Sequence, residues 1–229
     1  MAGAMKPRPG KRAPQKRVAA TLPKDVLGEL RQTVAPAKAD QAIARLERAV
    51  ALLERGDPRG AAAEAAKAKA LAPRSAAVRE VLGLALYGEG RWREALAEMQ
   101  TYRRVSGRAD QNHIIADCHR ALGNPDRAVP LAEEALAARG VPLAARTEAV
   151  VVAASALADL RRFDQALGLL RRVKTREDVG GPEVLRVWYV TADILERAGR
   201  RDDARREFRK ILRHDAAAFD AAERLAALG

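Results

Sequence analysis

Apolar side chains recur at helical spacing along most of the chain. Around the stretch from Gly88 to Met99, the pattern indicates the end of one helix, a tight glycine turn and the start of a second amphipathic helix. Apolar residues three and four positions apart place one face of each helix against its neighbour. The same pattern recurs from about residue 38 onward, and it predicts five consecutive helical hairpins.

Two of the predicted turns contain a capping residue followed by proline. Asp57-Pro58 lies in the first hairpin and Asn124-Pro125 in the third. Each Asp or Asn is expected to be the N-cap of the second helix, with the proline as its first residue. Pro130 falls inside the second helix of the third hairpin, where a proline removes a backbone donor. We therefore expect either a kink or a late helix start at that point.

The two ends of the chain differ from the repeats. Residues 1–21 are basic, contain three prolines and have almost no large apolar side chains, so we expect a disordered tail. A capping helix is expected within residues 22–36, with Pro23 in its first turn and an apolar face covering the first hairpin. The repeat domain then spans residues 37–229. It ends with a second capping helix at about 216–228, which closes the stack with Phe219, Leu225 and Leu228.

One alanine occupies the same place in the second helix of every hairpin. The successive spacings between these alanines are 34, 33, 38 and 38 residues. A short side chain there lets two helices approach closely, so a bulky replacement is expected to cost roughly 1–3 kcal/mol through overpacking. The marker alanines are Ala61, Ala95, Ala128, Ala166 and Ala204.

Residues around these alanines resemble the tetratricopeptide repeat (TPR) family, whose units are about 34 residues long. The second hairpin has Leu82-Gly83 and Leu86 before Ala95 and Met99, and the fifth has Trp188, Ala192 and Leu195 before Ala204 and Phe208. The resemblance covers residues 38 to 216. It implies an all-α fold, a right-handed α-solenoid of about five TPR-like hairpins with a capping helix at each end.

Composition supports helices packed on helices. Hydrophobic residues make up 48% of the 229 residues but aromatic residues only 3%, which suits alanine- and leucine-rich helices and argues against a sheet. One cysteine, Cys118, excludes an internal disulfide and fits a reducing compartment. The chain shows neither a secretory signal nor an apolar run of the ~18–20 residues that a membrane span needs. We therefore expect a soluble, cytoplasmic protein.

The resemblance implies that the first helix of each hairpin lines a concave groove that holds a peptide. Acidic side chains dominate the positions assigned to this groove after the first hairpin, whereas arginines dominate the outer helices. We therefore predict a non-enzymatic interaction scaffold that binds a basic segment of a partner protein. In the alternative interpretation, the same acids pair with neighbouring arginines. The predicted groove residues are Glu80, Tyr87, His113, Asp117, Arg120, Asp159, Tyr189, Asp193 and Glu196.

The formal charge of +12 suggests a second class of function. Half of this charge lies in the tail, which contains no acid, and a flexible basic arm is an electrostatic footprint for RNA or DNA. The alternative prediction is therefore a protein that docks on RNA or a ribosome through its tail and outer arginines. The tail could also fold back into the acidic groove. Its cations are Lys6, Arg8, Lys11, Arg12, Lys16 and Arg17.

No catalytic arrangement is evident in the sequence. His113, Asp117, Cys118 and His119 form the one cluster that resembles metal ligands, but a second ligand-bearing element is missing. Cys118 has no base with an orienting partner. No glycine-rich phosphate loop follows a strand. We therefore predict no enzymatic activity, no metal and no cofactor, and the sequence leaves the oligomeric state open.

Overall fold

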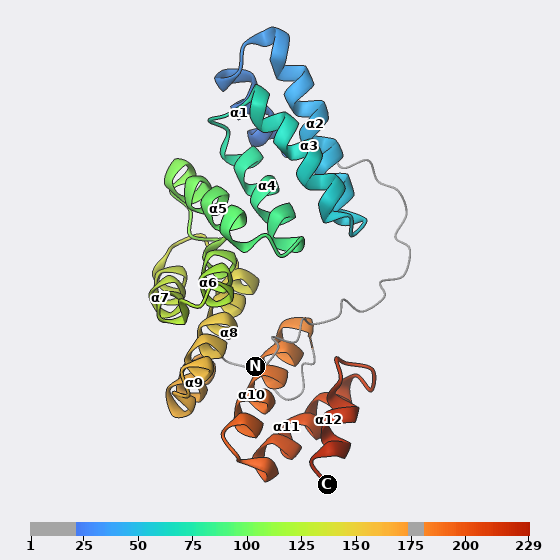
Figure 1. Ribbon diagram of the computed structural model, residues 1–229, viewed down its shortest axis with the longest axis vertical. Helices are drawn as coiled ribbons and strands as arrows, with labels where there is room; N and C mark the ends of the chain where they lie inside the picture. The colour runs from blue at the N-terminus through green and yellow to red at the C-terminus, as the bar shows by residue number, and fades with distance from the viewer. Residues whose placement is uncertain (1–21, 174–180) are drawn as a thin grey trace. The chain divides into compact units, whose positions relative to one another are not determined.

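The computed structural model describes residues 22–173 and 181–229, and all regular structure in these residues is helical (Figure 1). This confirms the predicted all-α solenoid of helical hairpins. A short 3-10 helix, η1 (Pro125–Arg127), precedes α7. The α-helices are α1 (Lys24–Thr33), α2 (Pro36–Glu54), α3 (Pro58–Leu71), α4 (Ala76–Gly88), α5 (Trp92–Ser106), α6 (Asn112–Ala121), α7 (Ala128–Ala137), α8 (Leu143–Asp159), α9 (Phe163–Leu170), α10 (Pro182–Arg197), α11 (Arg201–His214) and α12 (Ala221–Ala227).

The described residues form two compact units, which divide within α8. The N-terminal unit comprises residues 22–152, and the C-terminal unit begins at Ala153. In the N-terminal unit, α2 pairs with α3, α4 with α5 and α6 with α7, and each pair packs on the next (Figure 1). In the C-terminal unit, α10 packs against α9 and α11, and α12 packs against α11. None of the helices in the described ranges combines the length and apolar content needed to cross a bilayer.

The five marker alanines are all fully buried, at 0% exposed surface. Their short side chains allow the paired helices to approach closely. Gly83 shows how tight this packing is, because a Cβ placed there would lie 2.9 Å from Cε of Met99. Met99 itself is fully buried, four residues after the marker alanine of α5. A larger side chain at position 83 would therefore force Met99 to move.

The two capped turns behave differently. The side chain of Asp57 accepts a hydrogen bond from the amide of Gly60 at 2.9 Å, so the predicted N-cap of α3 is confirmed. The prediction for Asn124 is wrong, because its side-chain amide donates to the carbonyl of Leu122 at 3.2 Å. Pro125 consequently begins η1 rather than α7.

Pro130 is accommodated by a late helix start, one of the two expected outcomes. Helix α7 begins at Ala128, so Pro130 is its third residue. The first amides of a helix have no intrahelical acceptor, and a proline in the first turn therefore costs no hydrogen bond. The preceding 3-10 turn carries the chain from Asn124 to this start.

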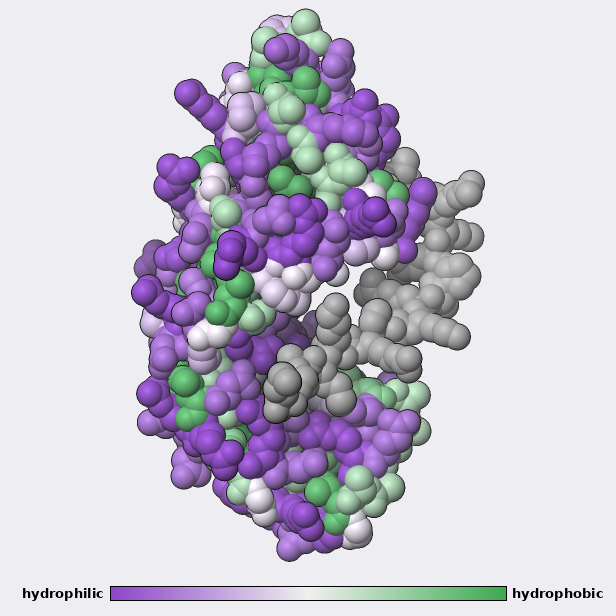
Figure 2. Space-filling view, in the orientation of Figure 1, coloured by the Kyte–Doolittle hydropathy of each residue, from purple (hydrophilic) through white to green (hydrophobic). Residues whose placement is uncertain are grey.

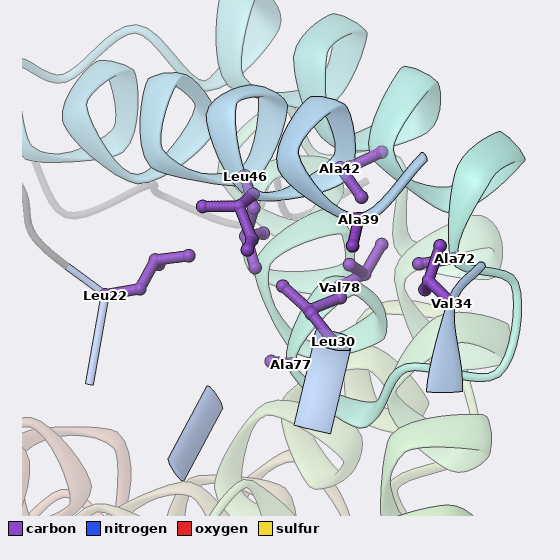
Figure 3. Packing of buried hydrophobic residues seen from close by; sticks show 11 residues of the cluster. Leu22, Leu30, Val34, Ala39, Ala42, Leu46, Ala72, Ala77 and Val78 are labelled. Carbon is purple, nitrogen blue, oxygen red and sulfur yellow. The ribbon is translucent and has the colours of Figure 1, made fainter. Parts of the chain in front are cut away.

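Helix α1 closes the N-terminal end of the first hairpin. Leu30 of α1 is fully buried and packs in one cluster with Leu46 of α2 and Val78 of α4 (Figure 3). The carboxylate of Glu29 also accepts a hydrogen bond from the amide of Ala76 at 2.8 Å, at the start of α4. These apolar and polar contacts together hold α1 in place over the first hairpin.

The C-terminal helix is shorter than predicted. Helix α12 begins at Ala221, so the expected helix at about 216–228 lacks its first five residues. Asp215 turns the chain instead, since its side chain accepts from the amide of Ala217 at 2.9 Å. Phe219 has a positive φ of 56° and is 46% exposed, so its predicted role in closing the core is wrong. Leu228 is buried as expected.

Candidate functional site

In the N-terminal unit, the predicted groove residues of α4 and α6 contact one another. The phenol of Tyr87 donates a hydrogen bond of 2.6 Å to Oδ2 of Asp117 on the next first helix. The guanidinium of Arg120 donates from Nε to Oδ1 of the same aspartate at 2.9 Å. Asp117 is therefore held by a neutral donor from α4 and by a cation from its own helix.

Glu80 is oriented by a neutral group. Its carboxylate accepts a hydrogen bond of 2.7 Å from the side-chain amide of Gln111, which directly precedes α6. Burial raises the pKa of Glu80, and the negative charge of Asp110 adds to this increase. The hydrogen bond from Gln111 and the charge of Arg108 oppose it. Gln111 thus fixes the position of Glu80 without cancelling its charge.

His113 lies among carboxylates, yet burial dominates its titration. Desolvation lowers the pKa of the imidazole, while the charges of Glu148, Asp110 and Asp117 act in the opposite direction. The side chain is therefore mostly neutral near pH 7. Asp110 is itself buried and accepts a hydrogen bond from the phenol of Tyr102 at 2.9 Å. This bond holds its carboxylate in place.

These residues form a cluster with a net negative charge, which we call the N-terminal polar cluster. Tyr87 donates to Asp117, Gln111 donates to Glu80, and the neutral His113 lies near Asp110 and Asp117. Three carboxylates stand against two guanidinium groups, so the carboxylates outnumber the cations by one. The carboxylates are Glu80, Asp110 and Asp117, and the guanidinium groups are Arg108 and Arg120.

The chemistry of this cluster does not suit a nucleophile or a metal. Cys118 is fully buried, and burial together with the charge of Asp117 raises the pKa of its thiol to about 12. The thiol is thus protonated at neutral pH and inert. Across the described part of the chain, no group of three or more His, Cys, Asp or Glu side chains is placed to hold a metal ion.

In the C-terminal unit, the predicted residues of α10 surround an arginine of α12 that the sequence did not single out. Nη2 of Arg224 pairs with Oε2 of Glu196 at 2.6 Å and with Oδ1 of Asp193 at 2.9 Å. Its Nη1 donates to the phenol oxygen of Tyr189 at 3.2 Å. The guanidinium also lies over the rings of Tyr189 and Phe208, 5.5 and 5.0 Å from their centroids.

Asp159 extends this arrangement toward the end of α8. Its carboxylate pairs at 2.9 Å with Arg197 of α10, which also lies 3.7 Å from Asp193. Together with Glu196, these acids form what we call the C-terminal polar cluster. Each of its three predicted acids has an arginine of the same chain within ion-pair distance. This geometry supports the alternative interpretation for the C-terminal unit.

The signal that would have found Arg224 is a repeated spacing. Tyr87 donates to Asp117, and Tyr189 donates to Asp220 at the same distance of 2.6 Å. The partners are 30 residues apart in one case and 31 in the other. Helix α12 therefore takes the position of a further first helix, and its polar residues extend the predicted groove positions.

The outer helices hold many of their cations in local ion pairs. Arg91, directly before α5, pairs with Glu94 at 2.6 Å, and Arg103 of α5 pairs with Glu134 of α7 at 2.5 Å. On the face shown in Figure 2, hydrophilic residues predominate and hydrophobic ones form small, separated groups. Among the described residues, the most exposed large apolar side chains are Val105, Leu143 and Phe219. The six tail cations of the alternative prediction, Lys6, Arg8, Lys11, Arg12, Lys16 and Arg17, lie outside the described residues.

Comparisons with known proteins agree on one family. Two models of the tetratricopeptide repeat match residues 46–112 and 114–219, which together make up well over half of the 229 residues. No curated protein is significantly similar to this chain in sequence.

Solved structures of several TPR proteins resemble the fold. TTC0263 from Thermus thermophilus is 17% identical with a TM-score of 0.63, over 82% of this chain and 98% of that chain. YrrB, described as a TPR protein with an unusual peptide-binding site, is 20% identical with a TM-score of 0.55, over 80% and 91%. MamA is 16% identical with a TM-score of 0.59, over 80% and 95%. At these identities the likeness extends to the fold alone.

Proposed function

The chain belongs to the tetratricopeptide repeat family, and we propose that it is a non-enzymatic scaffold that binds a basic segment of a partner protein along α4 and α6. The family generally serves protein–protein interaction. The finer assignment concerns the N-terminal polar cluster, because its carboxylates outnumber its cations. An arginine-bearing segment is the partner chemistry that this imbalance favours.

One observation carries the proposal: Glu80 and Asp117 are both positioned by neutral donors. Gln111 holds Glu80 at 2.7 Å, and Tyr87 holds Asp117 at 2.6 Å. A carboxylate fixed in this way loses little freedom when it binds a cation, so the cost of ordering it is already met. Partial burial also strengthens its attraction for a guanidinium.

Arg120 is the internal competitor in this cluster. It pairs with Asp117 within one helix, three residues apart, and its side chain is 33% exposed. Pairs of this kind contribute only about 0.2–0.5 kcal/mol. An arginine of the partner would therefore compete with Arg120 for Asp117.

The test is the binding of a labelled peptide to the full chain. The probe is a fluorescein-labelled peptide of four Arg-Ser repeats, measured by fluorescence polarisation. Glu80→Gln and Asp117→Asn keep the shape of each side chain and remove its charge. Each is expected to weaken binding about tenfold, equivalent to about 1.4 kcal/mol.

Glu134→Gln on α7 is the matched control. It removes one negative charge from an exposed acid of a second helix, where Glu134 pairs with Arg103. The proposal expects it to leave peptide affinity nearly unchanged. Equal losses in all three variants would indicate attraction to overall charge, and no loss in Glu80→Gln and Asp117→Asn would overturn the proposal.

A further inference from the structure

Arg224 sits in the C-terminal polar cluster as a bound ligand would. Its N–H groups donate to the carboxylate of Glu196 and to the phenol oxygen of Tyr189, and the carboxylate of Asp193 lies within ion-pair distance. Two aromatic rings lie beside its planar face. Carboxylates in the plane and rings against the face are the two ways in which proteins recognise a guanidinium. The cluster is therefore complementary to arginine, and the chain supplies the arginine itself.

The helix that carries Arg224 has few other attachments. Helix α12 has seven residues, and within it only Ala221 is fully buried. A helix of this length is not stable without tertiary contacts. Besides Arg224, it is held by the hydrogen bond from Tyr189 to Asp220 and by Arg205, which donates to the carbonyls of Leu228 and Gly229.

Phe219, two residues before α12, adds a ring contact and has an unfavourable backbone conformation. The ring of Phe219 lies 4.5 Å from that of Tyr189, centroid to centroid, and nearly half of this side chain is exposed. Its positive φ of 56° is disfavoured for a bulky residue. Release of α12 would let Phe219 leave this conformation, which lowers the cost of opening.

We propose that α12 is a displaceable latch, in which Arg224 occupies an arginine-binding site and an arginine of the partner segment competes for it. The site consists of Tyr189, Asp193 and Glu196 of α10 with Phe208 of α11. This inference rests on the proposed function for its partner chemistry, but it uses a different set of residues. The tethered arginine lowers the apparent affinity of the partner by the fraction of molecules in which the latch is open.

The experiment uses the full chain carrying Glu80→Gln and Asp117→Asn, which together remove two charges from the N-terminal polar cluster. The probe is the same fluorescein-labelled Arg-Ser peptide. Adding Arg224→Gln is expected to raise its affinity about tenfold, the gain for a latch that is closed in about nine molecules of ten. Adding Asp193→Asn and Glu196→Gln to that variant should abolish the gain.

Arg213→Gln is the charge-matched control, because Arg213 is an exposed cation of α11. It removes the same charge and should leave affinity unchanged. Arg224→Lys keeps the charge but loses the planar set of guanidinium N–H donors. It should therefore raise peptide affinity less than Arg224→Gln does. Hydrogen exchange gives a second measurement in the unmodified chain, in which the peptide should accelerate exchange of the α12 amides.

The outcomes separate this inference from the proposed function. If Arg224→Gln and Arg213→Gln have the same effect on affinity, or if exchange in α12 does not respond to the peptide, the latch is overturned. If Arg224→Gln gains affinity that the α10 carboxylates account for, the latch stands. That result holds even where Glu80→Gln and Asp117→Asn alone change nothing, in which case only the proposed function falls.

Discussion

In each unit, a tyrosine on the first helix of a hairpin makes the same hydrogen bond, but the charged residues around this bond differ. Tyr87 donates to Asp117 of α6, and Tyr189 donates to Asp220 directly before α12, both at 2.6 Å. Beside Tyr87, the arginine lies on the same helix as its aspartate and is 33% exposed. Beside Tyr189, Arg224 reaches back to two acids of α10 and is only 17% exposed. At the same repeat position, carboxylates are therefore in excess in the N-terminal unit, whereas Arg224 pairs with the acids in the C-terminal unit.

This difference shows how a repeat protein can vary its binding surface without changing its packing. The buried alanines and the tyrosine–aspartate bond stay the same, while the source of the neighbouring cation changes. The cation from the same helix, Arg120, is the more exposed of the two. A cation from the next helix ties two helices together, so its removal has a structural consequence as well as an electrostatic one.

The largest expected effect comes from the buried residue four positions after the marker alanine. Phe208→Ala should lower the free energy of unfolding by about 3–5 kcal/mol, and Met99→Ala by about 2–5 kcal/mol. Only Phe208 contacts Arg224, so only its loss should also accelerate hydrogen exchange in α12. Urea denaturation with hydrogen exchange measures both quantities. Equal protection of α12 in the two variants would contradict the role given to Phe208.

The next largest effect is a difference in stability loss between two arginine variants, one in each unit, Arg224→Gln and Arg120→Gln. Arg224→Gln leaves Asp193 and Glu196 without their shared cation, and hydrogen bonds to charged groups contribute about 1.5–3 kcal/mol. The pair of Arg120 with Asp117 lies within one helix, and a pair of this kind contributes only about 0.2–0.5 kcal/mol. Denaturation in urea at low and high salt would check this order. Similar losses in the two variants would remove the contrast between the units.

Tyr87→Phe and Tyr189→Phe test the feature that the units share. Each variant deletes one hydroxyl and keeps the ring, so each should cost about 0.5–1.5 kcal/mol. The loss should be somewhat larger for Tyr189→Phe, because the hydroxyl of Tyr189 also accepts a hydrogen bond from Arg224. Thermal denaturation of both variants provides the measurement. A loss in one variant alone would show that the bond is not an equivalent part of the two units.

The smallest expected effect is a difference in pH dependence between acids that hold their own cations and those that do not. Hydrogen bonds from Lys67 and Arg45 lower the pKa of Glu64 from 4.5 to about 2, whereas burial raises the pKa of Glu80. The stabilisation from Glu64 is present above pH 4.5 and is lost as the pH falls toward 2. For Glu80, ionisation costs stability, and this cost disappears as the pH falls through its raised pKa.

Glu64→Gln should therefore destabilise the chain near pH 7 and lose its effect in acid. Glu80→Gln should be neutral or stabilising near pH 7, and this gain should also fade in acid. Both effects are expected to stay below about 1 kcal/mol, since the cations around Glu64 are well exposed. Carboxyl titration by NMR, with urea denaturation at each pH, checks the two signs. If the pKa values of Glu64 and Glu80 were both shifted from 4.5 in the same direction, this assignment would be contradicted.

Much of the fold could be predicted because it depends on local patterns. Helical spacing of apolar residues and the recurring alanines identify the hairpins, and the Asp57-Pro58 pair identifies the start of α3. The errors arise where two local rules compete. Asn124 precedes a proline as Asp57 does, but Pro130 shifts the start of α7 to Ala128, and the side chain of Asn124 bonds elsewhere.

The partners of the site residues could not be predicted because they depend on how successive helices align. Arg224 lies 28 residues from Glu196, and Arg197 lies 38 residues from Asp159. Sequence spacing shows that these side chains occupy corresponding positions in successive hairpins, but not which acid pairs with which arginine. Treating α12 as the first helix of a further hairpin, rather than as a simple cap, would have placed Asp220 and Arg224 among these positions.

The most direct test of the central claim is to locate a bound basic segment by photo-crosslinking. An Arg-Ser peptide with a central benzoylphenylalanine would be irradiated with the full chain, and the adducts would be mapped by mass spectrometry. Our account predicts adducts on α4 and α6, between Ala76 and Ala121 but not on α5, with their yield reduced by Glu80→Gln and Asp117→Asn. Adducts confined to the outer helices α5 and α7, unaffected by these two variants, would contradict it.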